Sequence, residues 1–157
     1  MGPAFVALMS QDDNLAVRKA IEAAPAPGSV LVVAGGSVSR SATIGGLLAL
    51  ELQNMGSIAL VTDGLVRDAG EIRQLQFGVW CRGVTPMASN KNGPASVGGP
   101  VSIGGIVIRD GDLVIADDDG VVVWPEEQID DLLVRAETKL KADNDRLARL
   151  QKEAGNL

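Results

Sequence analysis

Two buried-strand patterns separated by one helical pattern restrict this chain to a small set of folds. Residues 29–36, "SVLVVAGG", and residues 57–64, "SIALVTDG", are runs of aliphatic and β-branched residues that end at glycine, a pattern typical of strands buried on both faces. Residues 44–55 between them follow an apolar helical pattern, and Gly56 stands where a helix C-terminus favours glycine. Strands joined through a helix run parallel, with a right-handed connection. The sequence therefore predicts an α/β fold built around one βαβ unit.

The rest of the chain alternates further helical and strand patterns with loops rich in glycine and proline. Three N-cap candidates at 12–14 favour a helix start at that point. Asp-Gly dipeptides at 110–111 and 119–120 predict turns between short antiparallel or mixed strands. The other expected elements are helices over 14–24, 68–76 and 126–153, a strand over 78–84, a loop over 86–105 with a strand near 100–103, and three strands over 106–125.

Size, charge and cysteine content narrow the class of protein. At 157 residues, of which 46% are hydrophobic, the chain is expected to form one domain over residues 1–157. Its 14 basic and 20 acidic residues give a net charge of -6, which argues against nucleic acid as a partner. No run of about 18 apolar residues is present, so no membrane partner is expected. With Cys81 as the only cysteine, no internal disulfide can form, and we expect a soluble cytoplasmic protein.

The absence of histidine excludes several kinds of catalytic site. Ser-His-Asp and Cys-His catalysis both need an imidazole base, and most zinc and copper sites need an imidazole ligand. Cys81 is accordingly interpreted as a buried small apolar residue rather than a nucleophile. Any metal ion would have to be a hard cation held by oxygen ligands.

Two carboxylates and a guanidinium follow the second buried strand in "VTDGLVRDAG", residues 61–70. Asp63 and Gly64 stand at the strand end, and Arg67 and Asp68 stand where the next helix begins. Ligands bind at this carboxyl edge of parallel sheets because loops and helix N-termini meet there. The alternative is structural, since Asp-Gly is a common turn and Asp68 could simply cap its helix.

The stretch "GGSVSRSATIGGLL", residues 35–48, also leaves a strand at this edge and opens a helix with small residues. Exposed backbone amides at such a helix start can hold a carboxylate or a phosphate. The stretch is not a P-loop, because the Gly-Lys-Ser/Thr ending is absent. "DDDG" at 117–120 is interpreted as a hairpin turn rather than a calcium loop, because no glutamate stands at the twelfth position.

Several segments, taken in order, resemble the RraA-like family over about residues 3 to 155. They are "PGSVLVVAGG", "GGLLALELQNMGSIALVTDGLVRDAGEIRQL", "CRGVTP", "GGIVIRDGDLVIADDDGVVVWP" and the closing charged helix. The family includes class II pyruvate aldolases and a regulator of ribonuclease activity. The resemblance implies an α/β sandwich of the swivelling β/β/α type with a long C-terminal helix. It also implies homotrimers or hexamers with active sites between subunits, and members generally carry an N-terminal helical segment that this chain lacks.

The resemblance also implies the components of an active site. Asp68 would bind a catalytic Mg²⁺ or Mn²⁺ ion, and Arg67 would contact the pyruvyl group of a 2-oxo acid substrate. The helix start formed by Gly45, Gly46, Leu47 and Leu48 would bind the substrate, whose carboxylate the amides of Leu47 and Leu48 would receive. Aldolase members usually have an acidic residue where this chain has Gly46, so one carboxylate near the metal's water shell is missing.

The last helix carries one further candidate, Asp143. It lies on a heptad-like apolar stripe, where it is either solvent-exposed or functional. The residues of this stripe are Ile129, Leu133, Ala136, Leu140, Asp143, Leu147 and Leu150. By the resemblance, Asp143 of a neighbouring subunit would support the water shell of the metal ion.

The function implied by the resemblance is cleavage of 4-hydroxy-2-oxo dicarboxylic acids to pyruvate, with decarboxylation of oxaloacetate as a related activity. The metal ion and Arg67 would stabilise the negative charge that develops on the keto oxygen. The alternative is a non-catalytic regulator that binds a ribonuclease or another protein. The pair Arg67-Asp68 favours catalysis, because the regulator type lacks the metal-binding carboxylate.

Overall fold

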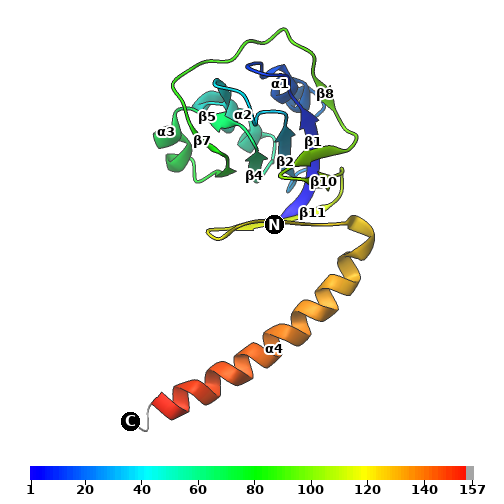
Figure 1. Ribbon diagram of the computed structural model, residues 1–157, viewed down its shortest axis with the longest axis vertical. Coiled ribbons are helices and arrows are strands. Elements are labelled where there is room, and N and C mark those ends of the chain that lie inside the picture. The colour runs from blue at the N-terminus through cyan, green and yellow to red at the C-terminus, as the bar shows by residue number, and fades with distance from the viewer. Residues whose placement is uncertain (155–157) are drawn as a thin grey trace. The chain divides into compact units, whose positions relative to one another are not determined.

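The computed structural model describes residues 1–154, and this part of the chain contains two compact units. The first runs from Met1 to Pro125 and contains the strands (Figure 1). The second begins at Glu126 and is helical. None of the helices within residues 1–154 combines enough length with enough apolar character to cross a bilayer.

The first unit is built on a seven-stranded mixed sheet. Its strands are β1 (Gly2–Leu8), β2 (Val30–Ala34), β4 (Ala59–Thr62), β6 (Gly78–Trp80), β8 (Ser96–Val97), β11 (Leu113–Asp117) and β12 (Gly120–Trp124). Strands β1, β2, β4 and β6 run parallel in that order, and β11 and β12 continue the sheet antiparallel beyond β1. Helix α2 (Gly46–Asn54) connects β2 to β4, which confirms the predicted βαβ unit.

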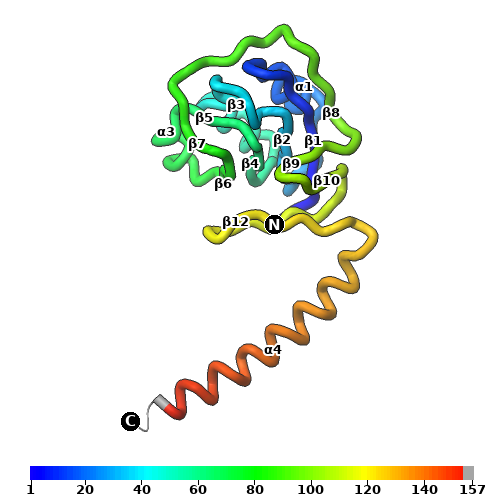
Figure 2. Tube along the Cα trace, in the orientation of Figure 1, coloured from blue at the N-terminus to red at the C-terminus, as the bar shows by residue number. Residues whose placement is uncertain are grey.

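Two smaller sheets complete this unit (Figure 2). One contains the parallel strands β3 (Ala42–Ile44), β5 (Leu65–Val66) and β7 (Gly83–Val84), and the other is the antiparallel pair β9 (Val101–Ile103) and β10 (Ile106–Ile108). The single strand predicted over 78–84 is wrong, because β6 and β7 belong to different sheets. Between them the N–H of Arg82 donates to the carbonyl of Gly64 at 2.8 Å. The chain therefore leaves the main sheet after β6, as it does after β4.

The predicted turn at 110–111 is present between β10 and β11. It joins two sheets rather than closing a hairpin, since β10 pairs with β9 while β11 pairs with β1. Asp110 Oδ1 accepts the N–H of Val6 at 2.8 Å, so this corner is fixed to β1. The turn at 119–120 does close the predicted hairpin, with Asp117 opposite Gly120 across β11 and β12.

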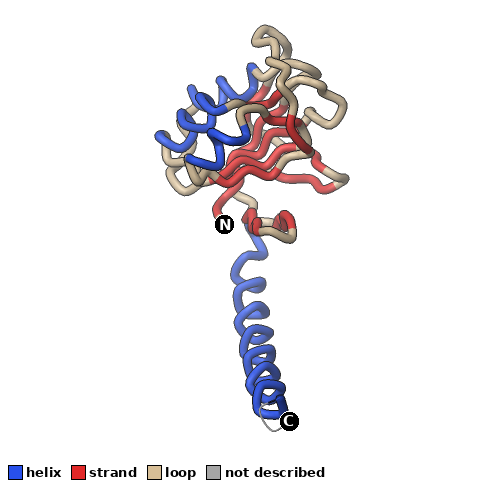
Figure 3. Tube along the Cα trace, turned by 90° about the vertical axis from the view of Figure 1, so that its left-hand side faces the viewer, coloured by secondary structure: helices blue, strands red, loops and turns tan. Residues whose placement is uncertain are grey.

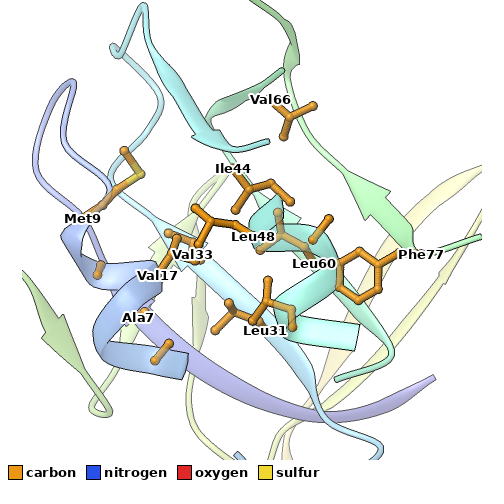
Figure 4. Packing of buried hydrophobic residues seen from close by; sticks show 14 of the residues in the cluster. Ala7, Met9, Val17, Leu31, Val33, Ile44, Leu48, Leu60, Val66 and Phe77 are labelled. Atoms are coloured by element: carbon orange, nitrogen blue, oxygen red, sulfur yellow. The ribbon is translucent and has the colours of Figure 1, made fainter. Parts of the chain in front are cut away.

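The helices of the first unit lie over one face of the main sheet (Figure 3). Helices α1 (Leu15–Glu22), α2 and α3 (Ala69–Gln74) pack on strand residues such as Leu31 and Leu60 in one buried cluster (Figure 4). The other face packs on the β9–β10 pair in a second cluster that includes Val32 and Val101. Burial on both faces explains the uninterrupted apolar sequences of β2 and β4. The result is the predicted layered α/β fold.

The second unit consists of the 3-10 helix η1 (Glu126–Gln128) and α4 (Ile129–Ala154), which confirms the predicted C-terminal helix. Ion pairs between residues four apart stabilise α4, and Lys139 Nζ lies 2.7 Å from Asp143 Oδ1. Leucines of the predicted stripe are exposed within the described chain. Helix α4 therefore keeps an apolar seam that its own unit does not cover.

Candidate active site

The first residues of α2 lie against Arg67, Asp68 and Glu71, and two glycines make this approach possible. A Cβ atom on Gly45 would lie 2.5 Å from Asp68 Oδ2 and 2.7 Å from Arg67 Nε, and a Cβ on Gly46 would overlap Glu71 Oε2. Contacts of this kind exclude any larger residue unless the charged side chains move. The predicted helix start at 45–48 and the predicted pair Arg67-Asp68 are therefore brought together.

Asp68 holds α2 rather than its own helix. Its carboxylate Oδ2 accepts the N–H of Gly46 at 3.1 Å and lies 3.4 Å from Arg67 Nε. It occupies the N-cap position of α3 but makes no side-chain cap bond there, so the helix-cap alternative is not supported. Its backbone is left-handed, with φ of 54°. A non-glycine residue in this region is uncommon and is often found at functional sites, where neighbouring contacts maintain it.

Arg67 is fixed at its backbone and open at its side chain. Its N–H donates to the carbonyl of Ile44 at 2.9 Å, within the pairing of β3 and β5. The side chains of Arg67 and Asp68 are 42% and 37% exposed, so both remain accessible to a ligand. Their mutual contact is charge-assisted and runs between Arg67 Nε and Asp68 Oδ2.

A small recess of about 120 Å³ opens beside this corner. Its lining residues include Asn14, Arg18, Gly45, Leu47, Leu48, Arg67, Ser89 and Lys91. Three cationic side chains and a helix N-terminus therefore surround one concave surface, which is an arrangement suited to a carboxylate.

Asn14 lines the recess and carries a buried, unsatisfied polar atom. The residue is 6% exposed, and its Nδ2 donates to the carbonyl of Thr43 at 3.1 Å. Its Oδ1 is buried and has no hydrogen-bond partner within the described residues. A buried acceptor without a donor is costly, and an ordered water molecule is a common partner for such an atom.

Sequence reasoning missed Arg18 and Lys91 and considered Asn14 only as a helix cap. The signal for Lys91 was available, because it is the only charged residue in the loop over 86–105. Arg18 lies on an ordinary amphipathic helix and offered no such signal.

The remaining sequence candidates have structural partners. Asp63 Oδ1 accepts the N–H of Gly36 at 2.8 Å, which ties the loop after β2 to the end of β4. Cys81 Sγ lies 3.4 Å from the carbonyl of Gly83 and is partly buried. A larger apolar cavity of about 650 Å³ includes Asp63, Trp80 and Arg82 in its lining. The polar side chains of Trp80 and Arg82 already donate to backbone carbonyls there, so this cavity is less suited to polar chemistry.

The corner at α2 also fits a hard divalent cation. Within residues 1–154 no three acidic or cysteine side chains form a complete ligand cage. Mg²⁺ commonly binds through one or two carboxylates and retains several waters. We call the surface formed by Gly45 and Gly46, against which Arg67, Asp68 and Glu71 lie, the glycine cradle. The Asp68 carboxylate on this cradle is partly exposed, and the Glu71 carboxylate lies over Gly46, so one or two carboxylates are available to a cation. Asp143 belongs to the second unit, where it pairs with Lys139, and its proposed role remains a prediction.

Comparison with known proteins gives consistent matches. The model of the RraA-like family, described as aldolase/RraA, matches residues 1–123. A Thermus thermophilus protein named 4-hydroxy-4-methyl-2-oxoglutarate aldolase is 37% identical over 115 residues, which are 73% of this chain and 70% of that protein. A protein from Halalkalibacterium halodurans, which bears the same name provisionally, is 37% identical over 146 residues, covering 93% of this chain and 69% of its own length.

Solved structures match as well. Streptomyces coelicolor RraAS2, described as an unusual member of the RNase ES inhibitor RraA protein family, superposes with a TM-score of 0.83 at 31% identity. The alignment covers 94% of this chain and 77% of the Streptomyces chain.

Proposed function

This chain belongs to the RraA-like family, and from that premise we propose that it is a divalent-metal-dependent class II pyruvate aldolase. Its substrates would be 4-hydroxy-2-oxo dicarboxylic acids, which it would cleave to pyruvate. The aldolase names of its relatives support a lyase activity. The observation that carries the proposal is the placement of Arg67 and Asp68 on the glycine cradle, next to an electropositive recess.

Substrate binding is assigned to the recess. The amides of Leu47 and Leu48 lie in the first turn of α2, where no intrahelical acceptor exists for them, and would receive the carboxylate next to the keto group. Arg18 and Lys91 would attract the second carboxylate of a dicarboxylic substrate.

The chemistry follows from the charges at the corner. Mg²⁺ or Mn²⁺, held by Asp68 and water, would supply Lewis-acid polarisation of the keto oxygen. Arg67 would face the same oxygen and stabilise the negative charge that develops there as the C3–C4 bond breaks. The hydroxyl at C4 loses its proton to water as the bond electrons move into the pyruvate enolate, which then takes up a proton at C3. Oxaloacetate would react alike, with CO₂ leaving instead of a carbonyl product.

We extend the proposal to a homotrimer or hexamer. The exposed leucines of α4 form the kind of seam that packs on another subunit, and Asp143 interrupts that seam with a carboxylate. In an assembly, Asp143 of a neighbouring subunit would add negative charge near the ion, and it would have to leave its present pairing with Lys139.

The test is pyruvate release from oxaloacetate and from 4-hydroxy-4-methyl-2-oxoglutarate, with Mg²⁺ or with chelator. The wild type is expected to be active only with metal, and Asp68→Ala is expected to be inactive. Asp118→Ala is the matched control, because Asp118 is exposed in the 117–120 turn. Metal-independent release, or none from either substrate, would refute the catalytic proposal.

A second candidate is a regulator that binds a ribonuclease. The description of the Streptomyces neighbour as belonging to an inhibitor family favours it, and exposed Ile106, Val107 and Val122 offer apolar surface for a protein partner. Inhibition of a purified ribonuclease that survives Asp68→Ala would support this function, because the surface does not depend on the metal-binding carboxylate.

A further inference from the structure

Glu71 occupies the space that a side chain at position 46 would fill. A Cβ atom on Gly46 would overlap Glu71 Oε2 and would lie 3.2 Å from Glu71 Cβ and 3.3 Å from its Cδ. Glu71 stands in the first turn of α3, three residues after Asp68. The Asp68 carboxylate accepts the N–H of Gly46, and the Glu71 carboxylate lies over the same residue. Both carboxylates of this short segment therefore converge on the first residue of α2.

The two carboxylates differ in how they are satisfied. Asp68 accepts the N–H of Gly46 and pairs with Arg67. Within the described residues, the side chain of Glu71 makes no hydrogen bond and no ion pair, although its carboxylate lies over the same glycine. An exposed glutamate without a partner, held above a helix start, is available to interact with a ligand.

Charge balance shows what Glu71 adds. Asp68 and Arg67 carry opposite unit charges, and the N-terminus of α2 contributes about half a positive charge. Because the adjoining recess also holds Arg18 and Lys91, the surroundings of Asp68 are net positive without Glu71 and would repel a cation. The carboxylate of Glu71 offsets part of this positive charge next to Asp68 and so favours a divalent ion there.

We propose that Glu71 replaces the carboxylate missing at position 46 and determines the affinity of this site for a divalent cation. The inference rests on the proposed function, because it assumes that Asp68 holds the ion. Glu71 acts as a positioning residue: its carboxylate accepts hydrogen bonds from waters around the cation and supplies the local negative charge. The absence of a side chain at Gly46 is the condition that lets Glu71 reach this place.

Mn²⁺ binding to the full chain tests the proposal without an activity assay. The bound fraction is measured from the loss of the free Mn²⁺ signal in electron paramagnetic resonance. Glu71→Gln keeps the shape and removes the charge, and it is expected to weaken Mn²⁺ binding about 10- to 100-fold, as is usual for groups that support metal ligands. Gly46→Ala is expected to weaken binding as well, because its methyl group displaces the untouched Glu71 side chain.

Gly70→Ala provides the matched control. Gly70 lies in α3 next to Glu71, and a Cβ there would meet no atom within 4 Å. This variant is expected to bind Mn²⁺ like the wild type. The double variant Gly46→Asp with Glu71→Ala supplies the carboxylate from position 46 instead of position 71. It is expected to recover most of the Mn²⁺ affinity that Glu71→Gln loses.

The outcomes separate this inference from the proposed function. Wild-type affinity in Glu71→Gln or Gly46→Ala, combined with lost binding in Asp68→Ala, would overturn the role of Glu71 and leave the metal site intact. Absence of Mn²⁺ binding in the wild type would overturn both. Circular dichroism of each variant establishes that the helices are retained.

Discussion

Asp13 is predicted to be the residue whose loss most weakens the wall of the recess. Its buried carboxylate accepts three backbone N–H groups, from Leu15 at 2.9 Å and from Asn92 and Gly93 at 2.8 Å each. These bonds attach the start of α1 to the long loop between β7 and β8 that Figure 2 shows in green. The same loop carries Ser89 and Lys91 to the recess.

The magnitude follows from these contacts. Hydrogen bonds to a charged acceptor contribute about 1.5–3 kcal/mol each, and neighbouring bonds are not additive. Asp13→Ala leaves three backbone donors without their acceptor, so the free energy of unfolding is expected to fall by about 3–5 kcal/mol. Asp118→Ala, in an exposed turn, is the control and should change it by less than about 0.5 kcal/mol.

The effect should depend on pH. Burial alone would raise the pKa of Asp13, but the backbone hydrogen bonds from Leu15, Asn92 and Gly93 outweigh burial and hold that pKa below its ordinary value of 3.8. A group whose pKa is lowered by folding stabilises the protein above its unfolded pKa, and that contribution is lost as the pH falls through the folded pKa. The difference between Asp13→Ala and wild type should therefore be full near neutral pH and shrink below about pH 4.

Urea unfolding followed by tryptophan fluorescence and far-ultraviolet circular dichroism measures both effects. Trp80 and Trp124 lie in the main sheet and report on the first unit. A loss below about 1 kcal/mol at pH 7 would refute the reasoning, since one charge-assisted bond alone should exceed it. An equal loss at pH 7 and at pH 3 would refute the assigned role of the charge.

Three further predictions concern the site and its scaffold. Gly45→Ala should fold, because the backbone at this position is extended. Its rate of pyruvate release should fall about 100-fold, because the methyl group displaces Asp68 and Arg67. Gly70→Ala is the control and should keep full activity in the same assay. Lys91→Ala and Arg18→Ala should raise KM for a dicarboxylic substrate with kcat nearly unchanged, and an unchanged KM in steady-state kinetics would remove both residues from substrate binding. Gly56→Ala should lower the free energy of unfolding by more than about 1 kcal/mol in urea titrations, because its φ is +89° and its Cβ would lie 3.0 Å from Pro27 Cβ.

Local sequence patterns were sufficient to predict the strands and the helix that have strong apolar patterns of their own. The apolar runs of β2 and β4, the helix between them and Gly56 at its end were all confirmed. The pair Arg67-Asp68 and the helix start at Gly45 were each recognised as candidates. Family resemblance added that they belong together, and the cradle geometry is consistent with it.

The sequence by itself determined the strands β2 and β4 and the helices α1 to α4, because burial periodicity and glycine positions are local properties. Local patterns did not predict the strands β1, β3, β5 and β8. Only the tertiary structure decided their partners: β1 between β2 and β11, the separation of β6 from β7, and the loop residues that line the recess. The proposed role of Glu71 also depends on tertiary structure, since its carboxylate reaches Gly46, which lies 25 positions earlier in the sequence. Contacts between distant residues depend on how whole elements pack, and no local pattern encodes that packing.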